Sequence, residues 1–297
     1  MNTLNIKALS LLKLELETWA TACENFENLK KIETKKLDFE GFSIEVHFNQ
    51  SRIRSAAAKL DEKSIAERKC FLCAKNRPHE QRSINCGHFE LLVNPYPIFP
   101  QHFTIASKFH EPQRIDDYFA DFLRFTQELS DFVVFFNAAG CGASAPDHLH
   151  FQAGTKDFLP LFGDYKNLKQ KNAELVFFQN NCEIFLLKNY LRKVFCIESE
   201  NAQKAVQVFN LLTINFGIEK NKINLVAYFE NKKFYIFIFP RSAFRPRQFF
   251  AENEAEKLLV SPGSVEMSGI FITPIKAHFD KITKSDISSI YEQVSAY

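Results

Sequence analysis

The sequence predicts an α+β fold in which antiparallel β-sheets are flanked by helices. Several segments alternate apolar and polar residues, as strands with one buried face do. Other segments repeat apolar residues at the helical period, for example residues 114–132 and 202–215. The order strand, helix, strand, turn and strand occurs twice along the chain, so we expect two related halves, over residues 1–190 and 191–297.

The first half is expected to begin with an amphipathic helix over residues 4–25, because leucines and Trp19 recur there at roughly helical spacing. A proline-rich turn, residues 94–100, is expected to join two strands of a hairpin. The strands expected in this half are residues 37–48, 89–93, 103–106, 133–136 and 148–152, and a helix is expected over 114–132.

Residues 155–190 are predicted to form a less regular connection, with one strand-like piece at 183–187. The second half then repeats the first in outline. Its expected elements are a strand at 194–197, a helix at 202–215, strands at 223–228 and 234–239 around a turn at 230–232, and a C-terminal helix at 285–294. The segment Phe234–Phe239 is aromatic and aliphatic where the first half carries histidines, so the second half is predicted to be a degenerate copy.

The charge balance excludes two broad classes of partner. With 37 basic and 35 acidic residues the net charge is only +2, which argues against general binding of nucleic acid or of a membrane surface. The sequence has no apolar run near the ~20 residues that span a bilayer, and charged residues interrupt its N-terminal apolar pattern. Seven cysteines, an odd number, favour reduced thiols. We therefore expect a cytoplasmic protein.

Residues 137–154 are the stretch that carries chemistry. Small residues run from Ala138 to Ala145, and the following alternation places His148, His150 and Gln152 on one strand face. A neutral imidazole is a good nucleophile at phosphorus, so His150 is suited to a covalent phosphoryl transfer. An ordinary polar strand face remains the alternative. The donors expected to hold the phosphate oxygens lie around this histidine, namely Gln152, Ser144, Asn137 and the backbone of the turn at Gly142.

A zinc site is predicted from Cys70 and Cys73, which have the spacing of paired zinc ligands. Two further ligands are needed for tetrahedral coordination, and the residues alone leave two completions open. One is Cys86 with His88, close in sequence, and the other is His110 with His148, which would tie the loop to the active strand. Two thiols without metal are a third option. His47, His79 and His102 are interpreted as structural or exposed.

Several arginines are candidates for neutralising substrate phosphates, since guanidinium groups pair with phosphate in a planar, two-pronged geometry. Each of them alone is more often a solvated surface residue. The candidates are Arg52, Arg54, Arg77, Arg245 and Arg247.

The segment His148-Leu-His150-Phe-Gln152 resembles the HxHxQ signature of the histidine-triad (HIT-like) superfamily on its transferase side. That side includes galactose-1-phosphate uridylyltransferases, dinucleoside-tetraphosphate phosphorylases and GDP-hexose phosphorylases. The segment from Cys70 to Asn76 looks like the zinc-binding segment of the uridylyltransferases, and residues 100–110 resemble the hairpin common to the superfamily. These motifs cover about residues 50–154.

The resemblance implies that His150 is the nucleophile that accepts a nucleoside monophosphate and that Gln152 contacts the bound phosphate. It implies a structural zinc ion and favours the distant set of ligands, Cys70, Cys73, His110 and His148. Gln152 stands where the hydrolase branch has a third histidine, which favours transfer to phosphate or a sugar phosphate over transfer to water. Asp147 departs from the pattern, because the uridylyltransferases have proline directly before the first histidine. No second histidine cluster resembles their additional metal site.

We therefore expect a nucleotidyltransferase that acts on a nucleotide sugar or a dinucleoside polyphosphate through a nucleotidyl-His150 intermediate, with phosphate or a sugar phosphate as acceptor. Within that class a nucleoside-diphosphate-hexose phosphorylase is favoured. A nucleotide hydrolase and a zinc protein that binds nucleotides without turnover are the alternatives. The sequence leaves base, sugar and oligomeric state open, with a homodimer as one option.

Overall fold

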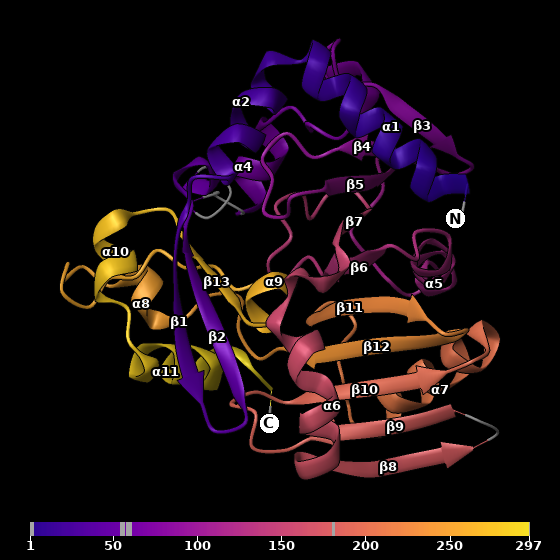
Figure 1. Ribbon diagram of the computed structural model, residues 1–297, viewed down its shortest axis with the longest axis vertical. Coiled ribbons are helices and arrows are strands. Elements are labelled where there is room, and N and C mark those ends of the chain that lie inside the picture. The colour runs from indigo at the N-terminus through magenta and orange to yellow at the C-terminus, as the bar shows by residue number, and fades with distance from the viewer. Residues whose placement is uncertain (1–2, 54–56, 58–60, 180–181, 297) are drawn as a thin grey trace.

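The computed structural model describes residues 3–53, 57, 61–179 and 182–296, and two β-sheets form its framework (Figure 1). The larger sheet has ten strands in the order β3-β4-β5-β7-β6-β11-β12-β10-β9-β8, and all neighbours are antiparallel. Its strands are β3 (Ser83–Cys86), β4 (Phe89–Val93), β5 (His102–Ser107), β6 (Phe132–Asn137), β7 (His150–Thr155), β8 (Ala173–Gln179), β9 (Cys182–Leu187), β10 (Val194–Ser199), β11 (Ile223–Glu230) and β12 (Lys233–Pro240). The predicted α+β class is confirmed.

The ten strands form two sets of five with the same internal order. The first set is β3-β4-β5-β7-β6 and the second is β8-β9-β10-β12-β11, and the two sets meet where β6 pairs with β11. In each set a helix connects the third strand to the next, α5 (Phe119–Glu128) in the first and α7 (Ala202–Asn215) in the second. The two related halves that the sequence predicts therefore share one sheet. The boundary at residue 190 stays a prediction. Strands β8 and β9 precede this boundary in sequence but belong to the second set, where β9 pairs with β10 and β8 with β9.

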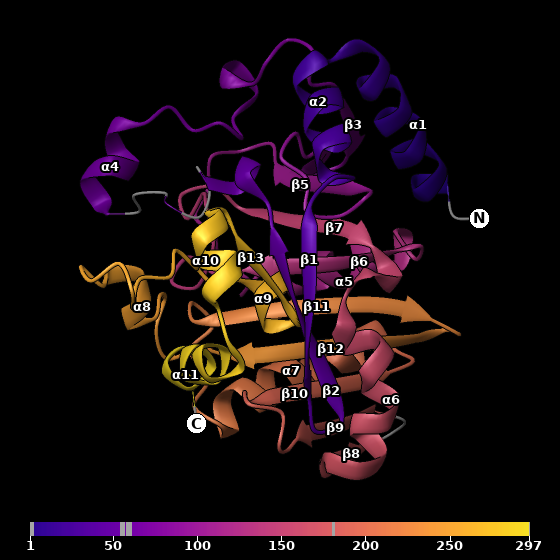
Figure 2. The same ribbon diagram turned by 60° about the vertical axis from the view of Figure 1, so that its left-hand side comes forward.

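The smaller sheet joins the two ends of the chain. Strands β1 (Glu33–Phe39) and β2 (Phe42–Phe48) form an antiparallel hairpin, and β13 (Ile270–Thr273) pairs with β2 in parallel. The prediction of one strand over residues 37–48 was wrong, because the chain reverses at Gly41. That glycine has φ +83°, a left-handed conformation that residues with a Cβ rarely adopt. Figure 2 shows this hairpin crossing in front of the strands of the larger sheet.

The N-terminal helical segment is broken, whereas the sequence predicts one helix over residues 4–25. Helix α1 (Thr3–Thr18) and helix α2 (Ala20–Leu29) are separated at Trp19, whose backbone is extended with φ −122° and ψ 99°. The Trp19 side chain is only 4% exposed. The apolar spacing continues across the break, so periodicity alone could not locate it.

Apolar cores lie on both faces of the ten-stranded sheet. One core combines α1, α5 and α7 with the sheet, and the rings of Phe119 and Phe209 stack there at 3.9 Å between their centroids. The other core lies under the small sheet and helix α6 (Pro160–Asn172). Because strands of both halves contribute to each core, the halves are packed as one body.

Residues 155–190 are more regular than predicted. They contain α6, β8 and β9, of which only the last was expected. Helix α6 is rich in lysine and asparagine and buries only Leu161, Tyr165 and Leu168, so its apolar pattern is weak. The predicted helix over residues 114–132 is shorter in the structure, where α5 ends at Glu128. The expected strands of the second half and the C-terminal helix are present, as Figure 1 shows.

The remaining described elements are short helices and turns, with one longer helix at the C-terminus. They are η1 (Gln50–Arg52), α4 (Glu62–Glu67), η2 (Ala74–Asn76), η3 (Lys156–Phe158), α8 (Arg247–Phe250), α9 (Ser264–Met267), α10 (Lys276–Lys281) and α11 (Lys284–Val294). Across the described ranges of the chain, none of the helices has the length and apolar character needed to cross a membrane.

Candidate functional site

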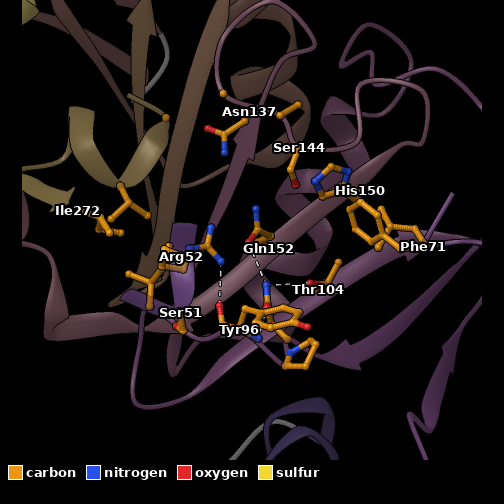
Figure 3. Close-up of a pocket in the computed structure, with 18 of the residues that line it drawn as sticks. Ser51, Arg52, Phe71, Tyr96, Thr104, Asn137, Ser144, His150, Gln152 and Ile272 are labelled. Atoms are coloured by element: carbon orange, nitrogen blue, oxygen red, sulfur yellow. Dashed lines mark hydrogen bonds between the residues drawn. The ribbon is translucent and has the colours of Figure 1, made fainter. Parts of the chain in front are cut away.

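A pocket of about 730 Å³ opens beside the N-terminal end of β7 and is bounded by the segment around Phe71, the turn after β6 and helix α9 (Figure 3). It brings together residues from both halves of the chain. Of the candidates named from the sequence, those that line it are Arg52, Asn137, Gly142, Ser144, His150, Gln152 and Arg245. Arg77 and Arg247 lie outside this lining, and Arg54 lies outside the described residues.

His150 is held in one orientation by the backbone around it. Its Nδ1 lies 2.8 Å from the carbonyl oxygen of His148. Because a carbonyl only accepts, Nδ1 carries the proton and Nε2 keeps its lone pair. Burial is the main cause that lowers the pKa of His150 to about 4, so the ring is neutral at pH 7. A neutral imidazole with an available lone pair is the reactive form for attack at phosphorus.

Gln113 fixes the backbone at the start of β7. Its Oε1 accepts from the His150 N–H at 2.7 Å, and its Nε2 donates to the carbonyl oxygens of His150 and Asn137, both at 2.9 Å. The side chain is 1% exposed. One amide therefore ties the reactive strand to the end of β6, although nothing local in the sequence marks Gln113 for this role.

His102 sets the direction of the Gln152 amide. Its Nδ1 accepts from the Ile98 N–H at 3.0 Å, so its Nε2 carries the proton and donates to Gln152 Oε1 at 3.0 Å. Asn94 donates to the same oxygen at 3.4 Å. With Oε1 occupied from behind, the Gln152 amide nitrogen is left for the pocket, as Figure 3 shows. Burial, followed by the charge of Arg52, lowers the pKa of His102 to about 3.

The turn between β6 and β7 packs tightly against the loop before α9. Gly142 has φ +102°, and a Cβ built on it would lie 2.8 Å from the Cα of Gly263. Only glycine fits this combination of conformation and contact. The turn also carries Ser144 into the pocket lining. The run of small residues thus allows the second half of the chain to close over the site.

Three arginines approach the pocket from different elements. Arg52 lines one wall and donates to the carbonyl oxygen of Tyr96 at 2.8 Å (Figure 3). Arg245 lies with its guanidinium 4.0 Å from the Phe249 ring centroid and donates to the Ser261 hydroxyl. Arg68, which was not among the candidates, also lines the pocket. Together they make the site suited to a ligand with several phosphates.

Asp147 holds Arg68 in place. Its Oδ1 accepts from Arg68 Nη2 at 2.5 Å, and its Oδ2 lies 3.6 Å from His110 Nε2. The residue that departs from the family pattern is therefore used to anchor a pocket arginine. Arg77, in contrast, binds Glu90 at 2.6 Å and the Leu72 carbonyl at 2.8 Å, so its guanidinium braces the neighbouring loop.

Four side chains near the pocket form a cluster that could hold a metal ion. All of their ligand atoms lie within 4.8 Å of one another, and the four residues are Cys70, Cys73, His110 and His148. Cys70 Sγ and Cys73 Sγ lie 3.3 Å and 3.6 Å from His148 Nδ1, and Cys73 Sγ lies 3.3 Å from His110 Nδ1. Two sulfurs and two imidazole nitrogens at such spacings fit tetrahedral Zn²⁺.

The surroundings of the cluster favour its ligand-competent state. His148 Nε2–H donates to the Ser107 carbonyl at 2.9 Å, which leaves Nδ1 for a metal. Burial opposes ionisation of the Cys70 thiol, but the contact with His148 and two backbone N–H groups lower its pKa to about 6. The other completion, Cys86 with His88, lies outside the cluster, and the His88 ring binds Glu111 at 2.6 Å.

Comparisons with protein families match two parts of the chain. Residues 11–155 match a family described as a domain of unknown function (DUF4922), and residues 167–297 match the family described as GDPGP1-like, C-terminal domain. No curated protein matches the sequence.

Solved structures of the yeast Ap4A phosphorylase Apa2 are similar in fold. The complex with Ap4A aligns with a TM-score of 0.59 at 17% identity, covering 93% of this chain and 96% of the yeast chain. The complex with AMP aligns with a TM-score of 0.57 at 18% identity, covering 95% and 96%. At these identities the likeness establishes the fold, and the alignment extends over both halves of the chain.

Proposed function

We propose that this chain is a nucleotidyltransferase of the HIT-like superfamily that forms a covalent intermediate on His150, which the GDPGP1-like match of its C-terminal part and the fold of the yeast phosphorylase support. The yeast structures are those of a phosphorylase bound to Ap4A or AMP, and the C-terminal family is GDPGP1-like. Both support an enzyme that acts on nucleotides. The observation that carries the proposal is the neutral His150 ring, which keeps its Nε2 lone pair in a pocket lined by arginines.

The reaction takes place in two displacements at one phosphorus atom. His150 Nε2 attacks the α-phosphorus of the donor, an N–P bond forms, and the P–O bond to the leaving phosphate breaks. The Nδ1–H bond to the His148 carbonyl stabilises the positive charge that develops on the ring. An oxygen of the acceptor phosphate then attacks the same phosphorus, the N–P bond breaks, and the neutral imidazole is restored.

Amide and guanidinium groups supply the stabilisation that a phosphoryl transfer needs. The Gln152 nitrogen lies on the same strand face as the nucleophile, and Arg52 and Arg68 both line the pocket. Gln152 replaces the third histidine of hydrolases in this position, which supports phosphate or a sugar phosphate as acceptor. We favour a donor that is a nucleoside-diphosphate hexose, with a dinucleoside polyphosphate as the other donor class.

The Cys2His2 cluster is proposed to bind a structural zinc ion. The ion would hold the segment around Phe71 against His148, two residues before the nucleophile on the same chain segment. All four ligand positions are supplied by the protein, as in structural zinc sites. Its contribution is therefore to fix the shape of the pocket wall.

The variant His150→Ala tests the covalent step. The donors to be assayed are UDP-, GDP- and ADP-sugars and diadenosine tetraphosphate, each supplied with inorganic phosphate or a hexose 1-phosphate as acceptor. We expect wild-type protein quenched during turnover with a donor labelled at the α-phosphate to carry an acid-labile label, and His150→Ala to carry none and to lose turnover. The matched control is His88→Ala, which removes a histidine outside the pocket lining.

Turnover that survives in His150→Ala would contradict the proposal. Product formed without any added phosphate or sugar phosphate would identify a hydrolase. Nucleotide binding without product for every donor would identify a binding protein.

A further inference from the structure

A buried series of hydrogen bonds runs from Arg241, directly after β12, to Asn137 at the pocket. Arg241 is 3% exposed and Asn224 is fully buried. The Arg241 guanidinium donates to the Val294 carbonyl at 2.9 Å, to the Pro262 carbonyl at 2.8 Å and to Asn224 Oδ1 at 2.5 Å. The second half of the chain thus anchors a group that reaches towards the first half.

The donor groups decide which way the Asn224 amide points. A guanidinium can only donate, so the Asn224 atom that faces Arg241 is its oxygen. The Asn224 nitrogen then donates to the Cys141 carbonyl at 2.7 Å and to Asn137 Oδ1 at 2.8 Å. Both hydrogens of that nitrogen are used.

The same reasoning decides the direction of the Asn137 amide. Its Oδ1 accepts from Asn224 and from the Ser264 N–H at 2.7 Å, and the Ser264 hydroxyl oxygen, which also lies 2.8 Å from the Phe136 carbonyl oxygen, is 2.7 Å away. A backbone N–H cannot accept, so the oxygen must face Ser264. The Asn137 nitrogen is left pointing into the pocket, towards the space bounded by His150, Gln152 and Arg52 (Figure 3).

We propose that Arg241 and Asn224 are positioning residues that act together with the Ser264 N–H to keep the Asn137 amide nitrogen, rather than its oxygen, turned towards a substrate phosphate. The inference rests on the proposed function, because it takes the pocket ligand to be a nucleotide. With the amide reversed, Oδ1 would face the phosphate oxygens, and a donor would be replaced by a repelling acceptor. The second half therefore sets the polarity of one pocket wall without contacting the ligand through these two residues.

The variant Asn224→Asp tests this relay, the series of hydrogen bonds from Arg241 through Asn224 to Asn137. The introduced carboxylate can still accept from Arg241, but its other oxygen would face Asn137 Oδ1 and the Cys141 carbonyl, which are both acceptors. This contact replaces a donor to the Asn137 oxygen by a repelling acceptor, and we expect it to outweigh the Ser264 N–H and to turn or displace the Asn137 amide. Binding of AMP and of GMP is measured by calorimetry, and we expect affinity to fall about tenfold or more, the value of one hydrogen bond to a charged group.

A double-mutant cycle separates this relay from a general loss of structure. Asn137→Ala removes the donor itself and should weaken binding to a similar extent. In that background Asn224→Asp should weaken binding by less than about twofold, since there is no amide left to turn. The matched control is Asn5→Asp, which places a carboxylate at a fully buried asparagine of α1 and should leave nucleotide affinity unchanged.

Wild-type protein gives a second measurement that does not require Asn224→Asp to fold. The side-chain NH₂ resonances of Asn137, assigned by their absence in Asn137→Ala, should shift when AMP or GMP is added. Unchanged resonances, full additivity in the cycle, or normal affinity in Asn224→Asp would each overturn the relay, as would a wild type that binds neither nucleotide. Turnover surviving in His150→Ala beside a non-additive cycle would remove the covalent mechanism and leave the relay standing.

Discussion

His102 shows how a residue behind the pocket controls one within it. Its ring is fully buried between the Ile98 N–H and the Gln152 oxygen, and both hydrogen bonds require the neutral tautomer with the proton on Nε2. Because its pKa is lowered to about 3, the ring keeps this tautomer across the physiological range. Gln152 is therefore held in one orientation across the physiological pH range.

Replacing His102 by phenylalanine should uncouple Gln152 while keeping an aromatic ring in the core. We expect kcat/KM for the best donor to fall about 100-fold, the usual scale for a misplaced group in an active site. The loss should be equal at pH 6 and pH 8, because the imidazole it removes is neutral at both. His47→Phe, which removes a 3% exposed histidine outside the pocket lining, is the control. A loss that changed between the two pH values would show that His102 titrates.

The site residues that could be identified from the sequence are those that stand in short motifs with characteristic intervals. His150 and Gln152 alternate on one strand, and Cys70 and Cys73 have a ligand spacing, so their types and intervals are informative. His102 and Arg68 could not be identified in this way, because their roles arise from contacts with Gln152 and Asp147, 50 and 79 residues away in sequence. Arg77 pairs with Glu90 instead of lining the pocket, and no local sequence pattern predicts that ion pair.

Among the elements, the loop from Cys70 to Asn76 is the one most dependent on a ligand. It contains only a short 3-10 turn, and Phe71 within it is 47% exposed. Asn76 donates to the Cys70 carbonyl within the loop. The loop is attached to the body by the two thiols, by the bonds of Arg68 and Arg77 beside it, and by the packing of Leu72 with Leu92, Ala106 and Ala145. Without a metal at the thiols, this wall of the pocket is held by one small apolar cluster and the arginine bonds.

Removal of the metal should therefore loosen this loop. We expect the protein as purified to contain one zinc ion per chain, and a chelator to lower both Tm and nucleotide affinity, because metal binding contributes to folding free energy. Added Zn²⁺ should restore both quantities. The variant Cys73→Ser should reproduce the chelated state, whereas Cys86→Ser, outside the cluster, should retain the metal. Metal analysis by mass spectrometry and thermal melts would measure this, and a full metal content in Cys73→Ser would exclude the assigned ligands.

Elements were predicted well where apolar periodicity was strong and poorly where it was weak or continuous. The hairpin of β4 and β5 and the run from β10 to β12 have clear patterns between turn residues. The breaks at Gly41 and Trp19 were not predicted, because the apolar spacing continues through both positions. Helix α6 was not predicted, because only three of its thirteen residues are buried and its apolar periodicity is therefore weak.

At the scale of the whole molecule, the seam between β6 and β11 joins the two halves into one sheet. The stacked rings of Phe119 and Phe209 connect their helices on one face, and apolar residues of both halves share the core on the other. The sequence predicts the repeat, but it contains no local sign of which strands meet, since pairing depends on contacts between residues distant in sequence.

We expect the full chain to unfold in a single cooperative transition, because each core spans both halves. Calorimetric and van't Hoff enthalpies should agree. Phe209→Ala, which removes one ring of the 3.9 Å stack, should cost about 3 to 5 kcal/mol and lower Tm without splitting the transition. Two separate transitions in either protein would show that the halves fold independently.

The relation between the halves also determines how much of the chain the pocket needs. The face of the second half that corresponds to the pocket is filled by α6, whose Tyr165 packs against Phe237 of β12. The pocket itself is lined by residues of both halves, such as His150 and Gln152 from the first and Arg245 and Ser264 from the second. The site is therefore complete only when the two halves are packed together, so nucleotide affinity should be lost in the same thermal transition that unfolds the chain.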